Sequence, residues 1–311
     1  MQGAAMARPK TSLIVSNRHR NLIEDALMIE QDDTQRTDTR GYMASTLAQI
    51  TLPHKQQKTL YYSRTNGKIT LSVRGHEDYG VPFGSLPRTI LAWMCTEAVR
   101  TKSPILNLGN STSDFVRNKL RVHYNGAYLA RVKTQALALS RAFISIDGKD
   151  GDIRAYENIV ITSKGFVFWN DANPNQTGLW NSNLTLTDEF FQAATKHPIP
   201  IDFQIYHSLR QSPMAMDIYT WLTYRMFVLL VSGRTEAMIP WAALMLQLGS
   251  SYPNTPRGLR NFKTNFLIRL NEVTSYWIDA RDHIEPLSEH LKLTPCKLLV
   301  PHTGNAKLYL P

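Results

Sequence analysis

One segment of the sequence carries side chains that suit hydrogen bonding to the edges of DNA bases. Between Arg257 and Asn271 there are four basic residues and no acidic residue. The candidate base-reading residues are Arg257, Arg260, Asn261, Thr264 and Asn265. Arginine can bond guanine at two atoms, and asparagine can bond adenine in the same way. Lys263 and Arg269, on the flanks, are expected to hold phosphates.

These residues share one side of a predicted helix from about Gly258 to Trp277. At about 100° per residue, the apolar residues of the helix fall within a stripe about 60° wide. The members of the stripe are Leu259, Phe262, Phe266, Leu270 and Val273. The stripe is expected to pack inward and to turn the basic and amide side chains outward. The alternative is an ordinary solvated face, which basic amphipathic helices also have.

A second helix, predicted over Ala127 to Phe143, offers a smaller polar face. It is expected to expose Ala130, Arg131, Thr134 and Gln135, with Lys133 beside them. Arg131, Lys133 and Thr134 are candidates for a phosphate contact or a second half-site, although this face could equally be solvated. A C-terminal ribbon adds Arg281 and Lys292 as candidate contacts to the DNA backbone, where most charges would simply face water.

Two similar series of elements would position these helices. The first has a hairpin at Tyr61 to Val73 around Asn66-Gly67, because that dipeptide favours a two-residue turn. Its further elements are predicted as a helix at Thr89 to Arg100, a strand at Ile105 to Leu108, a helix near Thr112 to Leu120, the helix at Ala127 to Phe143, and paired strands at Ile153 to Ile161 and Phe166 to Trp169.

The second series begins with Ser212-Pro213 ahead of a helix from Met214 to Leu230. A helix near Pro240, the helix at Gly258 to Trp277, and strands near Trp277 to Ile284 and His290 to Leu299 are predicted to follow. Ile90-x-x-Trp93 matches Ile218-x-x-Trp221 at a shift of 128 residues, and Lys133-Thr134-x-x-Leu137 matches Lys263-Thr264-x-x-Leu267 at a shift of 130. Nearly equal shifts suit duplication of one fold, although chance could also produce so few matches.

The predicted fold is therefore α+β, with two tandem winged-helix (winged helix-turn-helix) domains, an N-terminal β-hairpin and a flexible N-terminal tail. We expect residues 1–45 to be the mobile tail and residues 46–205 to be the first winged-helix domain. Residues 206–311 are expected to form the second domain and the main reader of DNA.

The amino-acid composition favours some kinds of partner and location and excludes others. The 35 basic residues outnumber the 25 acidic ones, so the net charge is +10, which favours a polyanionic partner. The two cysteines, Cys95 and Cys296, lie far apart, and a reducing, cytoplasmic location is expected. The longest apolar run, Met226 to Val231, is too short to cross a bilayer, and the N-terminus does not look like a signal peptide, so no membrane association is expected.

Motifs for catalysis are missing from the sequence. There is no phosphate-binding loop, no G-x-G-x-x-G and no H-E-x-x-H or C-x-x-C metal motif. No His-x-His pair accompanies Tyr61-Tyr62, as a nicking enzyme would require. We therefore expect no enzymatic activity, no cofactor and no metal.

Several rare-residue strings resemble the RepA-type plasmid replication initiators. They include GVPFGSLPRTILAWMCTEAVR from Gly80 to Arg100, His197-Pro198-Ile199-Pro200, SPMAMDIYTWLTYR from Ser212 to Arg225, and Phe262-Lys263-x-x-Phe266. The resemblance covers about residues 60 to 300. One departure is the turn before the helix at Ala127 to Phe143, which is reduced to Tyr124-Asn125-Gly126 and leaves the contact made by that helix in doubt.

The resemblance implies that the chain binds directly repeated origin DNA (iterons), helps melt the adjacent DNA and recruits the host initiator and replicative helicase. It also implies self-association as a dimer that represses its own promoter. The rival hypothesis is a winged-helix transcriptional repressor with no role in replication.

Overall fold

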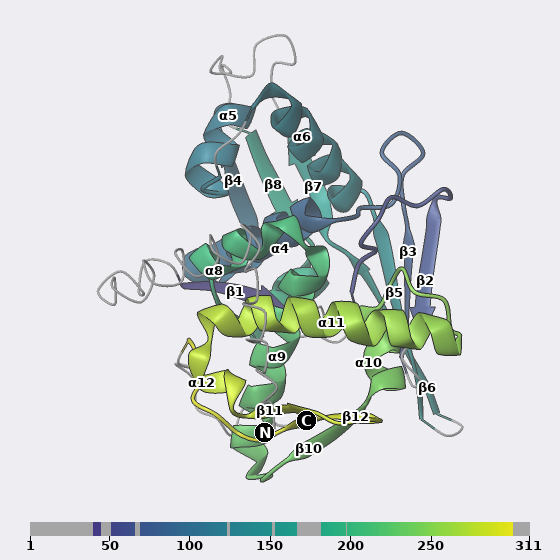
Figure 1. Ribbon diagram of the computed structural model, residues 1–311. Coiled ribbons are helices and arrows are strands. Elements are labelled where there is room, and N and C mark those ends of the chain that lie inside the picture. The colour runs from purple at the N-terminus through teal and green to yellow at the C-terminus, as the bar shows by residue number, and fades with distance from the viewer. Residues whose placement is uncertain are drawn as a thin grey trace, which may run out of the picture.

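The computed structural model describes residues 40–44, 51–65, 69–122, 125–150, 153–166, 182–196 and 198–300 of the chain. They form a mixed α/β structure, shown in Figure 1, in which helices and four small antiparallel sheets share one continuous hydrophobic core. The predicted tail at residues 1–39 and the turn at Asn66-Gly67 lie outside the described residues.

A first series of elements occupies the upper part of the view in Figure 1. In chain order it consists of α4 (Ser85–Thr101), β4 (Ile105–Gly109), α5 (Thr112–Asp114), the π-helical turn η1 (Phe115–Lys119), α6 (Gly126–Ser140), β7 (Thr162–Phe166) and β8 (Ser182–Leu186). The three strands form an antiparallel sheet in the order β4-β8-β7.

A second series repeats this order in the lower part of the view. It consists of α9 (Pro213–Ser232), β10 (Ala237–Pro240), α10 (Trp241–Leu248), α11 (Pro256–Tyr276), α12 (Ile278–Arg281), β11 (Ile284–Pro286) and β12 (His290–Leu293). Its sheet has the order β10-β12-β11, so the last strand is central in both sheets. Ile90 and Trp93 on α4 and Ile218 and Trp221 on α9 are all buried, as expected of equivalent positions.

Two further sheets complete the described fold. Strands β2 (Tyr61–Thr65), β3 (Ile69–Arg74), β5 (Phe143–Asp150) and β6 (Ile153–Val160) form an antiparallel sheet in that order, and β1 (Arg40–Ala44) pairs with β9 (Pro198–Asp202). The predicted hairpin is confirmed as β2 and β3, whose paired residues nearest the turn are Thr65 and Thr70. The remaining helices are α7 (Asp188–Lys196), α8 (Phe203–Ser208) and the 3-10 turn η2 (Leu209–Gln211).

Local signals explain where the long helices start. The Ser212 hydroxyl accepts a hydrogen bond from the Ala215 N–H (3.2 Å), and Pro213 follows it at the first helical position of α9. The left-handed Gly233 (φ 65°) ends the same helix. These sequence-encoded caps are why the predicted second-series helices lie close to the observed ones.

Several predicted elements are wrong in extent or pairing. Residues 40–44 of the expected mobile tail form strand β1, with Met43 and Ala44 buried. Among the described residues, the expected pairing of Ile153 to Ile161 with the stretch beginning at Phe166 does not occur: β6 pairs with β5, and Phe166, at the end of β7, pairs with Asn183 of β8. Residues 167–169 lie outside the described part of the chain.

Two predicted segments change their type. The strand expected from Trp277 to Ile284 contains helix α12 (Ile278–Arg281) instead, and in this region only the residues from Ile284 to Pro286 form a strand. The helix expected to end at Phe143 ends at Ser140, because Phe143 begins strand β5. Short helical and strand segments share apolar patterns, so their type depends on which neighbour they pair with.

Helix α9 is long and apolar enough to span a membrane by length and composition alone. In the structure it lies in the core, and 61% of its most apolar window is buried by the rest of the chain. It packs against α11, α10 and strand β9. Its apolar composition is accounted for by this position at the centre of the fold.

A buried ion-pair cluster joins the two series. Arg88 on α4 binds both carboxylate oxygens of Asp217 on α9, at 2.6 and 2.7 Å, and the His54 Nε2 lies 2.7 Å from Asp217. The side chains of Arg88 and Asp217 are only 4% and 9% exposed. Burial alone would raise the pKa of Asp217, but the Arg88 charge and the His54 hydrogen bond outweigh it, so this pKa lies below its ordinary value.

The segment around His54 and strand β2 also caps the end of helix α10. Arg64 donates to the carbonyls of Met245 and Leu246, and the Thr51 hydroxyl donates to Gln247 O (3.2 Å). The His54 N–H donates to the Ser250 hydroxyl (3.1 Å). The last carbonyls of a helix lack intrahelical partners. These contacts satisfy them and fix the second series against the first.

Replacing His207 with phenylalanine is expected to reduce the pH dependence of stability. His207 lies in α8, 8% exposed and stacked on Phe203 at 5.7 Å, and burial together with the charges of Arg210 and Arg121 lowers its pKa to about 4. The unfolded chain therefore binds the proton more readily between about pH 6.5 and 4, and the parent should lose about 2 kcal/mol from pH 7 to pH 5 through this group.

The measurement is urea unfolding of the parent and His207→Phe at pH 7, 6 and 5. Burial also lowers the pKa of His54. Because His54 is present in both proteins, its contribution to the pH dependence of stability cancels when the two proteins are compared. Equal losses of stability in the two proteins would refute this role of His207.

Candidate nucleic-acid interface

Helix α11 is anchored from behind by two phenylalanines. Phe262 and Phe266 are fully buried, and the Phe266 ring meets Trp221 of α9 and Trp241 of α10 edge-on at 6.2 and 5.7 Å between centroids. Leu270 and Val273 continue the buried side, while Leu259 is half-buried. The predicted inward stripe is confirmed, and it fixes which side of the helix faces outward.

The start of α11 is defined by its own sequence. The Thr255 hydroxyl accepts a hydrogen bond from the Gly258 N–H (3.1 Å), and Pro256 occupies the first helical position. A Cβ added to Gly258 would lie 2.0 Å from the Pro253 carbonyl oxygen, so only glycine allows this close approach. The N-terminal turn that carries Arg257 and Arg260 is therefore held firmly in place.

The outward side of α11 presents four of the predicted base-reading residues to solvent. Arg257, Arg260, Asn261 and Thr264 are exposed, and Ile268 between them is 42% exposed despite its apolar side chain. Figure 1 shows α11 running across the front of the molecule without another element over it. A convex helix with arginine, amide and methyl groups on its outer side has the shape and the chemistry for the major groove.

Three other predicted residues of α11 have partners within the protein. Lys263 donates to the carbonyls of Leu287 and Ser288, at 2.9 Å each, and its ammonium lies 4.7 Å from the centre of the Trp241 ring. Arg269 pairs with Glu272, which is 1% exposed. Asn265, half-buried, donates to the Asn261 carbonyl (2.9 Å). Lys263 and Arg269 therefore form contacts within the protein that the sequence did not predict.

The ribbon of β11 and β12 is tied to the start of α10. The Trp241 indole donates to Leu287 O (3.0 Å) and its backbone N–H donates to Glu289 O (3.1 Å). Together with Lys263, these bonds hold the tip of the ribbon beside α11. Of the two predicted residues near the ribbon, Arg281 is exposed, whereas Lys292 forms ion pairs with Glu236 (3.3 Å) and Glu285 (3.9 Å).

The corresponding helix of the first series, α6, differs from α11. Arg131 and Thr134 are exposed and Lys133 is half-buried, but Gln135, which the sequence predicted to be exposed, is only 6% exposed. Its side-chain oxygen accepts a hydrogen bond from the Phe83 N–H (2.9 Å), because the segment before α4 folds over this part of α6. The prediction for Gln135 was wrong.

Sequence reasoning missed polar residues that the fold brings to α6. Arg210 from the turn η2 and Ser85 and Thr89 from α4 line the same hollow as Arg131. Tyr128 lies one turn before Arg131, whose guanidinium is 5.6 Å from the centre of its ring. The spacing of three residues between Tyr128 and Arg131 could have indicated their contact from the sequence. Arg210 lies too far along the chain for a sequence pattern to place it beside them. Within the described ranges, no group of three or more His, Cys, Asp or Glu side chains could hold a metal ion.

One solved structure has a similar fold, and a second structure of the same domains has a lower score. A crystal structure of selenomethionine derivatives of domains 2 and 3 of RctB has a TM-score of 0.50 at 11% identity, covering 82% of this chain and 97% of that chain. A crystal structure of RctB domains 2-3 (residues 155–483) gives a TM-score of 0.45 at 11% identity, covering 80% and 96%. A search of curated proteins finds no match.

A family match is more specific than these fold similarities. Residues 81–242, more than half of the chain, match the family described as plasmid encoded RepA protein. The match includes the Gly80 to Arg100 and Ser212 to Arg225 strings that carried the resemblance, apart from Gly80 itself. The chain belongs to the plasmid-encoded RepA family.

Proposed function

We propose that this chain is a plasmid replication initiator that binds directly repeated origin DNA, with helix α11 as the main reader. The observation that carries the proposal is the division of α11 into a fully buried phenylalanine side and an outward side with Arg257, Arg260, Asn261 and Thr264. Membership of the RepA family supports a role in plasmid replication. The net charge of +10 favours DNA as the partner.

Each series of elements is proposed to be a winged-helix domain, divided near residue 205. The order of helix, strand, two helices and two strands supports this: the second series has it with the short helix α12 added after α11, and the first series has it with β5 and β6 inserted. In such a domain the third helix enters the major groove, which is the place of α11. The ribbon of β11 and β12 then flanks the DNA backbone.

Contacts to phosphates are proposed to come from residues around this helix. Arg281 is exposed for such a contact, and Lys263, Arg269 and Lys292 would have to share their side chains with the internal partners described above. Asn265, a proposed base-reading residue, would likewise share its side chain with the Asn261 carbonyl. The first domain is proposed to add a secondary contact with DNA through Arg131, Lys133 and Thr134. We expect the four solvent-exposed residues of α11 to contribute most to specificity.

The wider role is proposed from the family. The chain would bind iterons in the bacterial cytoplasm, promote local melting of the origin and recruit the host initiator and the replicative helicase. Self-association as a dimer would allow it to repress its own promoter. In this proposal the protein acts by binding alone, without catalysis and without a cofactor or metal.

Replacing Arg260 with alanine is expected to weaken binding to the cognate repeat by about 1–3 kcal/mol and to relax preference at one base pair. The reason is the loss of an arginine that can bond guanine at two atoms. Affinity is measured by fluorescence anisotropy with a duplex repeat, at one fixed salt concentration, because phosphate contacts make affinity depend on salt. Arg100→Ala, which removes an exposed arginine from the end of α4, is the matched control.

Parent-like affinity and base preference in Arg260→Ala would exclude α11 as the reader. Initiation is tested separately, by asking whether the chain supports replication of a plasmid that carries the direct repeats flanking its gene. A protein that binds these repeats but does not support replication would be a repressor instead.

A further inference from the structure

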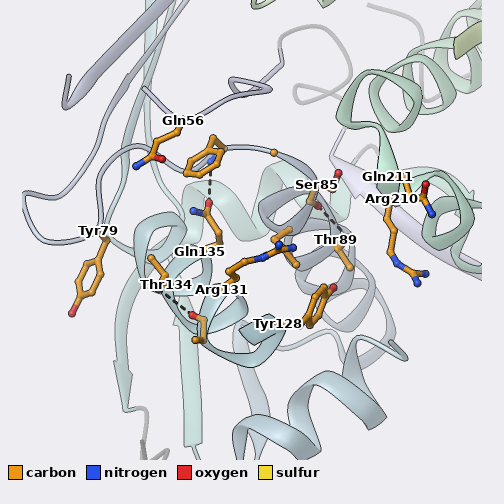
Figure 2. Close-up of a pocket in the computed structure, with 14 residues that line it drawn as sticks. Gln56, Tyr79, Ser85, Thr89, Tyr128, Arg131, Thr134, Gln135, Arg210 and Gln211 are labelled. Atoms are coloured by element: carbon orange, nitrogen blue, oxygen red, sulfur yellow. Dashed lines mark hydrogen bonds between the residues drawn. The ribbon is translucent and has the colours of Figure 1, made fainter. Parts of the chain in front are cut away.

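A cavity beside helix α6 has features that the proposed reading of duplex DNA does not use. Its volume is about 800 Å³, within the range of ligand-binding sites. Figure 2 shows Arg131 reaching from α6 toward Thr89 of α4, with Tyr79 at one end of the pocket and Arg210 at the other. The walls come from α6, the start of α4, the segment before α4 and the end of η2.

The charge of this cavity is positive. Arg131 and Arg210 are the charged residues among those that line it, and no acidic side chain is present in the lining. Burial raises the pKa of the Tyr128 hydroxyl, and both arginines act in the opposite direction, which places their positive charges close to that hydroxyl. An occupant that carries negative charge would therefore be favoured.

Uncapped donors at the start of α4 point to the same kind of ligand. Gly84, Ser85 and Leu86 line the cavity, and this 17-residue helix begins without a capping side chain or an acidic residue in its first turn. Gly84 has φ 78°, a conformation that glycine adopts readily. The Gly84 N–H donates to the Pro53 carbonyl (3.0 Å) and Pro87 has no N–H, so the donors at this end are the N–H groups of Ser85 and Leu86. Together with the helix dipole they favour a phosphate there.

Gln135 adds a hydrogen-bond donor to the lining of the cavity. Although it is only 6% exposed, it lines the cavity, and its side-chain oxygen is occupied by the Phe83 N–H. Its NH₂ group makes no hydrogen bond to any described residue. This amide group can therefore donate a hydrogen bond to an occupant of the cavity.

Aromatic rings complete the lining. Tyr128, Tyr79 and Phe83 are half-buried around the cavity. Outside it, Tyr79 packs against His76 at 5.4 Å between ring centres and lies 5.7 Å from the Arg141 guanidinium. Basic groups interleaved with aromatic rings are the pattern by which proteins bind single-stranded nucleic acid, with bases stacking on the rings.

We propose that this cavity binds single-stranded DNA, with the phosphate of one nucleotide at the start of α4 between Arg131 and Arg210 and its base against Tyr128 or Tyr79. A base in a duplex is stacked and paired, so it cannot enter a hollow of this kind. The inference rests on the proposed function, since a melted origin would supply the strand. In this proposal the secondary DNA contact of the first domain is a contact with single-stranded DNA.

The test uses the full chain and a labelled oligothymidylate of about 16 nucleotides, the upper end of the usual site size. The double variant Arg210→Ala/Tyr128→Leu should bind this probe about tenfold or more weakly, through loss of one charge and one stacking surface. Its affinity for the duplex repeat should stay at the parent value. Arg260→Ala should show the reverse pattern, and Arg100→Ala should change neither affinity.

Arg210→Ala alone, at an exposed position, keeps the test valid if the double variant does not fold, and it should also weaken the oligothymidylate complex. Parent-like binding of oligothymidylate by Arg210→Ala and the double variant would overturn the proposal, as would an equal loss of duplex and single-strand binding. If thymidine monophosphate competes as strongly as the oligonucleotide, the pocket takes a free nucleotide and the single-strand assignment is wrong. If the parent binds oligothymidylate but no duplex repeat, the proposed function fails while this site stands.

Discussion

Replacing Asp217 with alanine is expected to lower the free energy of unfolding by about 3–5 kcal/mol. The change removes the carboxylate that Arg88 binds at 2.6 and 2.7 Å and leaves the guanidinium buried without its counter-ion. Arg88 would keep its bonds to the carbonyls of Gly84 and Leu52, both 2.7 Å, but its charge would be uncompensated. His54 would also lose the acceptor of its ring N–H.

Urea unfolding near pH 7 measures this loss. Glu97→Ala is the control, because it also breaks a carboxylate–arginine pair at 2.6 Å, but Arg100 in that pair is 64% exposed. The control should cost about 0–1 kcal/mol, as exposed pairs usually do. Similar small losses in both variants would mean that the Arg88, Asp217 and His54 cluster does not hold the two series of elements together.

Replacing Phe266 with alanine is expected to cost about 3–5 kcal/mol of stability, through lost burial and the cavity left behind. Its ring is fully buried and lies within 6.2 Å, between centroids, of Trp221, Trp241 and Phe262. The same substitution should weaken binding to duplex DNA, because α11 loses the contact that orients its outward side. Both effects follow from a single anchoring ring.

Chemical unfolding and anisotropy with the duplex repeat are measured on the same preparations. Ile268→Ala is the matched control on the outward side of α11, where the side chain is 42% exposed and truncation should cost less than about 0.5 kcal/mol. If Phe266→Ala were as stable as Ile268→Ala, the packing described for α11 would be incorrect.

Much of the helical framework could be predicted from the sequence. The apolar spacing around Trp93 and Trp221 indicated α4 and α9, and both residues are buried. The inward stripe of α11 was also confirmed. These features depend on residues within a few positions of each other, so periodicity and capping are sufficient to predict them.

Strand pairing and side-chain partners could not be predicted in the same way. Three strand pairings join segments that are distant along the chain. They are β7 with β8, β10 with β12, and β1 with β9. Lys263 and Lys292 were predicted from their type and position, but the ribbon and its neighbours engage both of them. The residue type and position of a lysine in the sequence are the same whether its partner is a phosphate of DNA or a carbonyl group from another element of the protein.

The family and the two sides of α11 could be predicted from the amino-acid sequence, because rare strings and helical periodicity are local properties. The buried cluster of Arg88, His54 and Asp217, and the cavity shared by Arg131, Arg210 and Gln135, became visible only in the folded chain. Burial and proximity depend on how distant segments pack against each other, and the spacing of these residues along the chain does not indicate which of them lose their contact with water.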